Sequence, residues 1–457
     1  MRPLLAVLLT TVPTAVTGRR WVHGSEPFRT ALGSLIGIAA LAWGAIVGGL
    51  LGFVVPGAAA GLAAAWVAGP AVRRRSALRA ERRGTAVIAA ALVVLVVGGV
   101  LTTLAFWRPV PRWDAWAIWS LKAKAIASLD GFDNAVFTSP AYAYSHQDYP
   151  PLLSAWQAVA YRISGDLRVS YPTQVQLAWL WTAGALAILG LVARWRAPPR
   201  LILLAWAVAP QVIHQALTGY ADVPMALFLV AGAAAFADAI DGEDAGGRAG
   251  ILPAAVLLAA ASLTKEEGAL FAGAFLVPFV VIARTRRRAL VTGAVVAAAL
   301  APWFAFTRAN GLVSDFIRQR PGAPGVAGPV SPLGRLPQVL SSIGGQIVRL
   351  GGWALLIPAC AVAVLWLRGR IGPLVVAAGA AFAALTAVYL VSPYDITWHL
   401  SRSVDRTVVA PLGLLALAAS RAGTPRAVSE EGGARLGLEP TTRTARRSPA
   451  PGRQPPS

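Results

Sequence analysis

The chain has 457 residues, of which 56% are hydrophobic and 13% are charged, and its formal net charge at pH 7 is +21. Several apolar runs can cross a hydrocarbon core about 30 Å thick, which needs roughly 20 helical residues. The composition therefore excludes a soluble protein and predicts an all-α, polytopic transmembrane helix bundle of about 12–13 spans. The basic residues lie in short clusters between apolar runs, so the lipid bilayer is the expected partner and nucleic acid is not. The single cysteine, Cys360, excludes a disulfide framework.

Residues 1–84 are predicted to form an N-terminal group of transmembrane helices. The first apolar stretch predicts a short helix that is retained rather than cleaved. Runs at 31–53 and 55–72 predict a hairpin broken at Val55-Pro56-Gly57, because Pro and Gly favour turns. Six arginines within residues 73–83 then predict a cytoplasmic connector.

A long extracytoplasmic loop, residues 108–175, is predicted to follow an outward-going helix at 85–107. Apolar residues recur at helical spacing from Asp114 to Leu129, which predicts a helix with Lys122 and Lys124 directed away from its apolar face. Three tryptophans indicate that this helix lies at the membrane surface: Trp113, Trp116 and Trp119.

A second amphipathic, juxtamembrane helix is predicted to begin at Tyr149-Pro150-Pro151, since proline is tolerated in the first turn of a helix. Its predicted apolar face consists of Leu152, Trp156, Val159, Ala160 and Ile163.

Further apolar runs are predicted to alternate across the membrane, at about 176–193, 201–218, 223–240, 250–263, 268–283, 289–306, 345–367, 371–391 and 407–420. Every second connector carries arginine, which places these connectors on the cytoplasmic side together with residues 73–83. The opposite side receives all three lysines of the chain. Residues 421–457, rich in Arg, Pro, Ser, Gly and Thr, predict a disordered basic cytoplasmic tail.

Asp114 and Asp222 are the candidate catalytic residues. A carboxylate at the membrane surface could act as a general base, although Asp114 could also serve only as the N-cap of the helix that follows it. Asp222 ends a very short connector that begins at Gly219, and for this residue the alternative is a capped turn.

Three basic residues are candidates for binding a phosphate: Lys265, Arg402 and Arg406. Lys265 stands in a polar connector, residues 264–267, at the mouth of the bundle, where a short loop would also need polar residues for solvation alone. Arg402 and Arg406 are four residues apart and share one helical face. They could clamp a phosphate or diphosphate, or they could be interfacial residues that extend to water.

The loop residues His146, Asp148 and Tyr149 are further candidates for substrate binding. His146 and Asp148 could ligate a metal or orient an acceptor, or they could be ordinary polar loop residues. A divalent metal held by Asp114, Asp222 and His146 stays an open alternative, and no other cofactor is expected.

In their order along the chain, these motifs resemble the GT-C superfamily of integral-membrane glycosyltransferases, especially glycosyltransferase family 39, the protein O-mannosyltransferase-like branch. The resemblance covers about residues 85–420, and the matching positions are Asp114, Pro150-Pro151-Leu152, Asp222, Thr264-Lys265 and the segment WHLSRSVDR. It implies transfer of a sugar from a polyprenyl-phosphate carrier to an extracytoplasmic glycan, lipid or protein. Residues 85–420 would then be the catalytic module of a cell-membrane enzyme.

Two other functions remain as alternatives. A transporter or flippase would place ionisable groups inside its spans, where His214 and Asp238 are the candidates. A scaffold of the same type that has lost catalysis would bind the donor and serve as an assembly partner.

Overall fold

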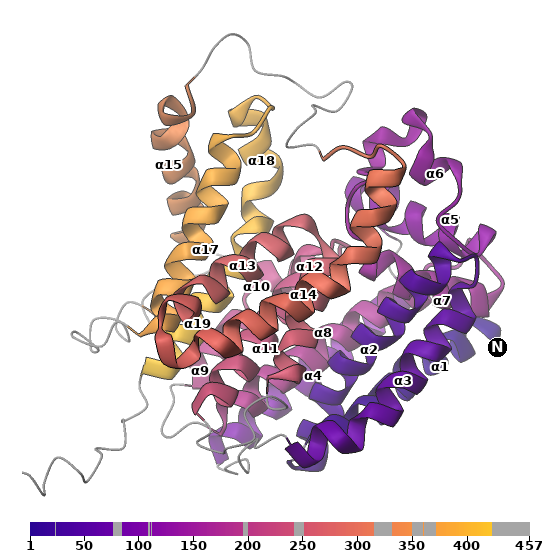
Figure 1. Ribbon diagram of the computed structural model, residues 1–457, viewed down its shortest axis with the longest axis horizontal. Helices are drawn as coiled ribbons and strands as arrows, with labels where there is room; N and C mark the ends of the chain where they lie inside the picture. Colours follow the sequence, from indigo (N-terminus) through magenta and orange to yellow (C-terminus); the bar gives the residue numbers. More distant parts are fainter. Residues whose placement is uncertain are drawn as a thin grey trace, which may run out of the picture. The chain divides into compact units, whose positions relative to one another are not determined.

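The computed structural model describes residues 1–22, 24–75, 85–107, 110, 112–194, 200–241, 251–314, 331–349, 360 and 372–422. These residues form helices joined by short connectors, and none of them lies in a β-strand (Figure 1). The expected all-α architecture is therefore confirmed. Several expectations concern segments outside the described residues: most of the arginine connector at 73–83, the run at 345–367, and the tail after residue 422.

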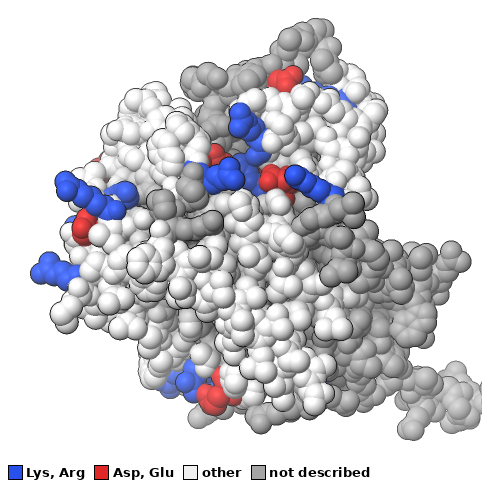
Figure 2. All heavy atoms as spheres, turned by 180° about the vertical axis from the view of Figure 1, so that it is seen from behind, with Lys and Arg blue, Asp and Glu red and all other residues white. Residues whose placement is uncertain are grey.

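In the described part of the chain, eight helical segments are long and apolar enough to cross a membrane, so the protein is a multi-pass membrane protein. They are α2 (Glu26–Leu50), α3 (Val54–Arg75), α4 (Thr85–Trp107), α8 (Tyr171–Val192), α11 (Asp222–Asp241), α14 (Ala283–Ala309), α17 (Pro373–Leu390), and the consecutive helices α18 (Ile396–Thr407) and α19 (Val409–Ala422). On the face drawn in Figure 2, charged side chains gather in the upper part and at the lower edge, and the broad band between them is almost uncharged.

Shorter helices account for other predicted runs. The first apolar stretch forms α1 (Arg2–Gly18), which packs along α2, and α12 (Leu252–Thr264) and α13 (Glu266–Val281) form a hairpin. α15 (Leu336–Ile347) lies beside α17 and α18.

The prediction of one continuous helix over residues 201–218 is wrong. The chain there forms α9 (Arg200–Ala207) and α10 (Pro210–Ala216). Pro210 has no N–H to continue the first helix, and eight residues of helix rise only about 12 Å.

The hairpin between α2 and α3 turns earlier than predicted. Its turn lies at residues 51–53, where Gly52 has a φ of +80°, and Pro56 and Gly57 belong to α3. Gly57 serves the packing instead: a Cβ built on it would lie 2.4 Å from the carbonyl oxygen of Gly44, and one on Gly48 would lie 2.6 Å from the Cα of Gly57. Small residues thus let the two backbones approach closely, as is common between helices in membranes.

Burial separates interior helices from peripheral ones. Of the residues in the most apolar stretch of α11, 89% are buried, and this helix packs against α8, α12 and α19. In the most apolar stretches of α4 and α14, only 22% and 28% of the residues are buried. Because the exposed residues in the middle of these two helices are mostly apolar, α4 and α14 present a surface suited to lipid there, whereas α11 forms the centre of the bundle.

The predicted loop at 108–175 is folded. It contains η2 (Ala115–Ser120), which has π-helical geometry, α5 (Leu121–Leu129), α6 (Ala135–Thr138), the 3₁₀ turn η3 (Pro140–Ser145) and α7 (Leu152–Ser164). The loop is tied to the bundle by the indole N–H of Trp303 in α14, which donates to the carbonyl oxygen of Asp148 at 3.0 Å.

Two details of the loop prediction are wrong. Lys122 does not project away from the apolar face: it is fully buried and donates a hydrogen bond to the carbonyl oxygen of His146. The helix α7 buries four of the five residues of its predicted apolar face and leaves Ile163 half-buried, but nearly all of its other residues are buried too. Trp156 of this helix donates to the carbonyl oxygen of Thr10 at 3.2 Å. α7 is therefore an interior helix rather than one lying on the membrane surface.

Candidate functional site

A cavity of about 590 Å³ opens where the loop meets α17 and α18, and its size is typical of small-molecule sites. Its walls come from six parts of the chain: the residues around the start of η2, the loop residues 146–149, the end of α10 with the α10–α11 connector, the α12–α13 connector, the end of α17, and α18. Seven of the predicted site residues line it: Asp114, His146, Tyr149, Asp222, Lys265, Arg402 and Arg406.

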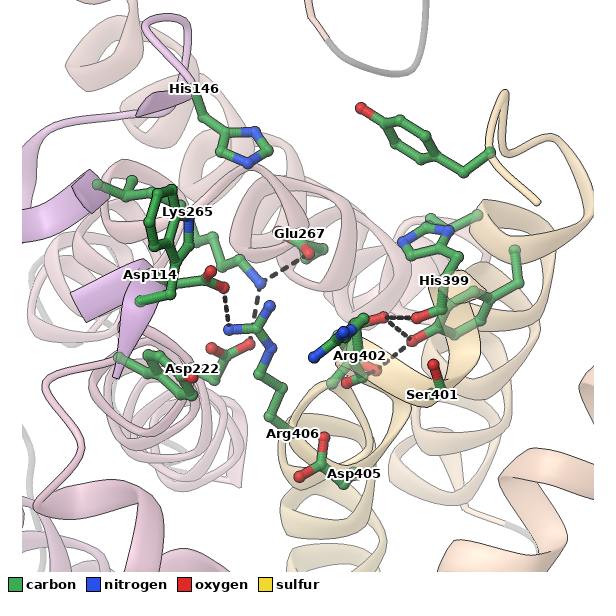
Figure 3. Close-up of a pocket in the computed structure, with 18 of the residues that line it drawn as sticks. Asp114, His146, Asp222, Lys265, Glu267, His399, Ser401, Arg402, Asp405 and Arg406 are labelled. Carbon is green, nitrogen blue, oxygen red and sulfur yellow. Dashed lines mark hydrogen bonds and ion pairs between the residues drawn. The ribbon is translucent and has the colours of Figure 1, made fainter. Parts of the chain in front are cut away.

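Asp114 forms an ion pair with Arg406, in which Oδ2 lies 2.6 Å from Nη1 (Figure 3). The N-cap role predicted for Asp114 is wrong, because its own backbone is already helical and its side chain accepts no capping hydrogen bond. The carboxylate is 25% exposed. It stands directly before the π-helical turn, a widened geometry often found at functional sites.

Arg406 is held from two sides. Its guanidinium carbon lies 4.6 Å from the centre of the Tyr220 ring, in addition to its ion pair with Asp114. α18 starts at a true cap, since Asp395 accepts a hydrogen bond of 2.8 Å from the backbone N–H of Trp398. Burial raises the pKa of Tyr220, so its phenol stays neutral at physiological pH.

Arg402 lies one turn before Arg406 in α18, and Figure 3 shows the two side chains entering the same space. The expected shared helical face is therefore present. Unlike Arg406, Arg402 is exposed and forms no ion pair with any residue that the structure describes. It is thus the cation best placed to meet an incoming anion.

Lys265 joins two carboxylates. Its ammonium lies 2.9 Å from Oδ1 of Asp222 and 2.9 Å from Oε1 of Glu267, and all three side chains are buried. Burial acts to lower the pKa of Lys265, but the negative charges of Asp222 and Glu267 outweigh it and the pKa is raised. The lysine therefore stays charged at physiological pH.

Local backbone geometry fixes this lysine. Lys265 is the single extended residue between α12 and α13, with φ −159° and ψ 154°. A Cβ on Gly268 would lie 2.0 Å from the carbonyl oxygen of Ala261, so only glycine permits the close approach of these two helices.

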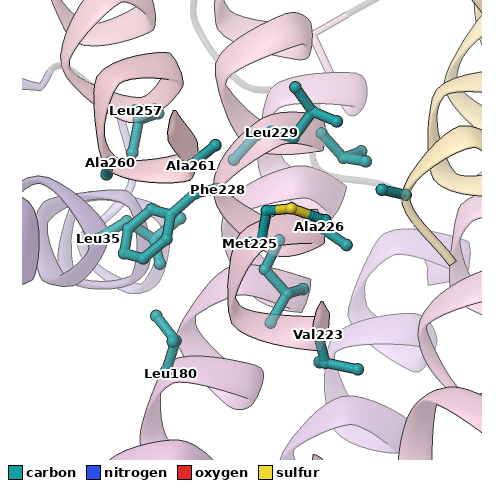
Figure 4. Packing of buried hydrophobic residues seen from close by; sticks show 14 of the residues in the cluster. Leu35, Leu180, Val223, Met225, Ala226, Phe228, Leu229, Leu257, Ala260 and Ala261 are labelled. Carbon is teal, nitrogen blue, oxygen red and sulfur yellow. The ribbon is translucent and has the colours of Figure 1, made fainter. Parts of the chain in front are cut away.

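Asp222 is the first residue of α11, and its carboxylate is used in the ion pair with Lys265. The rest of that helix lies deep in the apolar core (Figure 4), where Phe228 extends toward Leu35 of α2 and Ala260 of α12. The central helix of the bundle thus carries the carboxylate rigidly to the cavity wall.

His146 and Tyr149 form part of the wall contributed by the loop. Their rings stack at 4.3 Å, and His146 has a left-handed backbone with φ +51°. Asp148, between them, does not line the cavity. It interacts with the carboxyl group of Glu266, whose pKa is raised to about 9 by burial and by the charge of Asp148.

No group of three or more His, Cys, Asp or Glu among the described residues is arranged to hold a metal ion. Asp114, Asp222 and His146 therefore do not form the predicted alternative metal site. The two carboxylates are paired with Arg406 and Lys265 instead.

The sequence reasoning missed several polar residues of the cavity. Glu267 adjoins Lys265 and could have been chosen by its position alone. A hydrogen-bonded group between the end of α17 and α18 gave no such signal, because its members are chemically ordinary and meet only when the two helices pack together: Tyr389, Ser392, His399, Ser403 and Thr407. Two of them, His399 and Ser403, lie in the segment WHLSRSVDR, which was selected for its arginines.

Among the described residues that line the cavity, positively and negatively charged side chains are equal in number. The cations are Arg112, Lys265, Arg402 and Arg406, and the carboxylates are Asp114, Asp222, Glu267 and Asp405. Such a cavity suits a ligand whose charge shifts during a reaction. Preorganised cations can stabilise the negative charge that develops, while a carboxylate can accept a proton.

Comparisons of the chain with protein-family models, with curated proteins and with solved structures found no match.

Proposed function

We propose that the chain is a membrane glycosyltransferase that moves a sugar from a polyprenyl-phosphate carrier to an acceptor on the extracytoplasmic side. The observation that carries the proposal is the convergence of Asp114 with Lys265, Arg402 and Arg406 in one cavity of a membrane protein. These groups are a candidate base and candidate phosphate-binding cations, contributed by segments far apart in the chain.

Asp114 is proposed as the general base. Its pairing with Arg406 keeps the carboxylate in one orientation through Oδ2, and Oδ1 forms no other ion pair with a described residue. A carboxylate within hydrogen-bond reach of an acceptor hydroxyl can remove its proton during attack. Asp222 is proposed to act through Lys265, which it holds in place.

The cations are proposed to stabilise the leaving phosphate. Arg402 would contact the phosphate on entry, because no described carboxylate neutralises it, and Lys265 and Arg406 would respond to the charge that develops as the bond breaks. A bidentate guanidinium suits the oxygens of a phosphate.

The proposed step is a single displacement. The acceptor oxygen forms a bond to the anomeric carbon, the bond from that carbon to the phosphate oxygen breaks, and its electron pair stays on the lipid phosphate. The acceptor proton passes to Asp114. One displacement inverts the configuration at the anomeric carbon.

The arginine distribution supports the proposed sidedness. Arg284, Arg286, Arg287 and Arg288 cluster at the start of α14, just after α13 has led away from Lys265. If this cluster is cytoplasmic, as the positive-inside rule favours, the cavity opens on the other side.

The test is sugar transfer in proteoliposomes that contain a polyprenyl-phosphate sugar and a panel of acceptors. Asp114→Asn is expected to lower kcat by about a hundredfold or more, the usual contribution of general acid–base catalysis. The matched control is Asp133→Asn, an exposed carboxylate of the same loop, which should keep wild-type activity. Full activity in Asp114→Asn would remove the assignment.

The flippase alternative gains no support from its two candidate residues. Asp238 is paired with Arg194 at 3.3 Å in a buried position, and His214 contacts Arg112 at the cavity. Movement of an intact lipid-linked sugar across the liposome membrane, without any covalent product, would nevertheless replace the proposed reaction. Mass spectrometry of lipid that copurifies with the protein would identify the donor directly.

A further inference from the structure

Four aromatic residues of the loop form a chain of ring contacts that begins at the cavity, called here the aromatic strip: Trp113, Trp116, Tyr142 and Tyr144. The ring centres of Trp113 and Trp116 lie 4.5 Å apart, those of Trp113 and Tyr144 lie 6.4 Å apart, and those of Tyr144 and Tyr142 lie 6.1 Å apart. Trp113 also lines the cavity, next to Asp114. The strip therefore begins at the candidate base.

The two tryptophans of the strip are exposed. Trp113 and Trp116 are 56% and 47% exposed, and neither indole N–H donates to any residue that the structure describes. Most of the buried tryptophans behave differently, because the indole N–H donates to a backbone carbonyl oxygen in Trp21, Trp156, Trp181, Trp206 and Trp303. The two strip tryptophans thus keep both a ring face and a donor available.

A neutral sugar unit matches this combination. The C–H groups of a pyranose face carry a small positive charge and pack against the negative face of an aromatic ring. The hydroxyl groups around the sugar edge can accept from an indole N–H and exchange hydrogen bonds with a tyrosine hydroxyl. The planes of Trp113 and Trp116 meet at 70°, which makes a corner rather than a flat platform.

The competing role is an interfacial aromatic belt that anchors the protein in lipid. A belt residue needs only to face the bilayer, and Trp107, 83% exposed at the end of α4 and without an aromatic partner among the described residues, fits that role. Trp113 differs, since it borders a cavity lined by charged residues.

We propose that the aromatic strip binds a sugar unit of the acceptor, so that the acceptor of this enzyme is a glycan. This inference rests on the proposed transferase function. Stacking on the strip would present a hydroxyl of the terminal sugar to Asp114, because Trp113 and Asp114 are adjacent in the chain and both line the cavity.

The test measures binding in the absence of any donor. Full-length protein in nanodiscs is titrated with mannotriose, maltotriose and cellotriose by calorimetry, and saturation-transfer NMR reports which sugar protons contact the protein. At least one trisaccharide should bind saturably to the wild type. Trp116→Ala should weaken that binding about tenfold, Trp116→Phe should restore most of it, and the control Trp107→Ala should change nothing.

Three results would overturn the glycan inference: no trisaccharide binds the wild type, Trp107→Ala weakens binding as much as Trp116→Ala, or a Ser/Thr-rich peptide binds instead and depends on Trp116. Equal weakening by Trp107→Ala would indicate a lipid belt, and peptide binding that depends on Trp116 would indicate a protein acceptor. Failure of the transferase proposal looks different, because saturable trisaccharide binding without transfer from any polyprenyl-phosphate sugar would leave the strip intact as a binding site.

Discussion

Arg406 connects α18 to the loop through its ion pair with Asp114, while its guanidinium covers the ring of Tyr220. Arg406→Gln should therefore destabilise the protein by about 2 kcal/mol, since it leaves a partly buried carboxylate without its partner. It should also lower sugar transfer, because Asp114 loses its orientation. Arg402→Gln is the matched control for stability, as Arg402 is one turn away and exposed. Equal destabilisation by both variants, measured by thermal unfolding in detergent, would contradict the structural role of the pair.

The buried ion pairs of Lys265 with Asp222 and Glu267 predict that substitutions of Lys265 and Asp222 have coupled effects on the free energy of unfolding. Lys265→Met leaves two buried carboxylates facing each other, and Asp222→Asn leaves the lysine with Glu267 alone. The double variant should lose less stability than the sum of the two single variants, by roughly 1–3 kcal/mol. The control cycle combines Asp222→Asn with Arg402→Gln and should be additive. Additivity in both cycles would show that the contact between Lys265 and Asp222 contributes nothing to stability.

Glu266 predicts a pH-dependent stability. It lies at the first residue of α13, outside the eight spans, and it faces Asp148, the neighbouring Glu267 and the hydroxyl of Ser314, which donates to it at 3.0 Å. The pKa of Glu266 is raised from 4.5 to about 9, so the folded protein binds a proton that the unfolded chain releases. The stabilisation is complete below pH 4.5 and is lost as the pH rises toward about 9.

Glu266→Gln imitates the protonated side chain and should abolish this part of the pH dependence. Unfolding is measured in detergent at intervals across the window, and the variant should become progressively more stable than the wild type as the pH rises. Glu26→Gln, an exposed carboxylate in α2, is the control and should leave the slope unchanged. A wild-type slope in Glu266→Gln would mean that Glu266 does not hold the proton.

The contact between α2 and α3 predicts a size limit at Gly48. Gly48→Leu should separate the two helices and destabilise the protein by about 1–3 kcal/mol, because the side chain would meet the backbone of α3 at Gly57. Gly99→Ala is the matched control: it also lies within an apolar helix, and a Cβ there has nothing within 4 Å. Wild-type unfolding behaviour in Gly48→Leu would show that the close approach is not required.

The sequence predicted which side chains gather better than it predicted how they are held. Asp222, Lys265 and Arg406 could be selected because charge is rare in an apolar chain and each stands at the end of a helix. The partner of each could not, since ion pairs such as Asp114 with Arg406 join segments almost 300 residues apart. The N-cap interpretation of Asp114 was reasonable locally but is wrong, because the backbone of Asp114 is already helical and its carboxylate pairs with a distant arginine.

Local sequence patterns also gave wrong predictions where one residue type has two structural roles. Gly57 was interpreted as a turn residue, but in a bundle the same missing side chain permits close helix packing. Lys122 was expected to project away from the apolar face of its helix. A helical pattern cannot show that residues 137–149 fold back over it, so that its ammonium lies near the rings of Phe137 and Tyr149. Pro210, in contrast, was a readable sign that the run at 201–218 is broken.

Lys265 occupies the only non-helical position between α12 and α13. A hinge of one residue cannot bend without turning its own side chain, so any rocking of these two helices would swing the ammonium away from Asp222 or Glu267. Any motion of this helical hairpin would therefore change the charge pairing at the wall of the cavity.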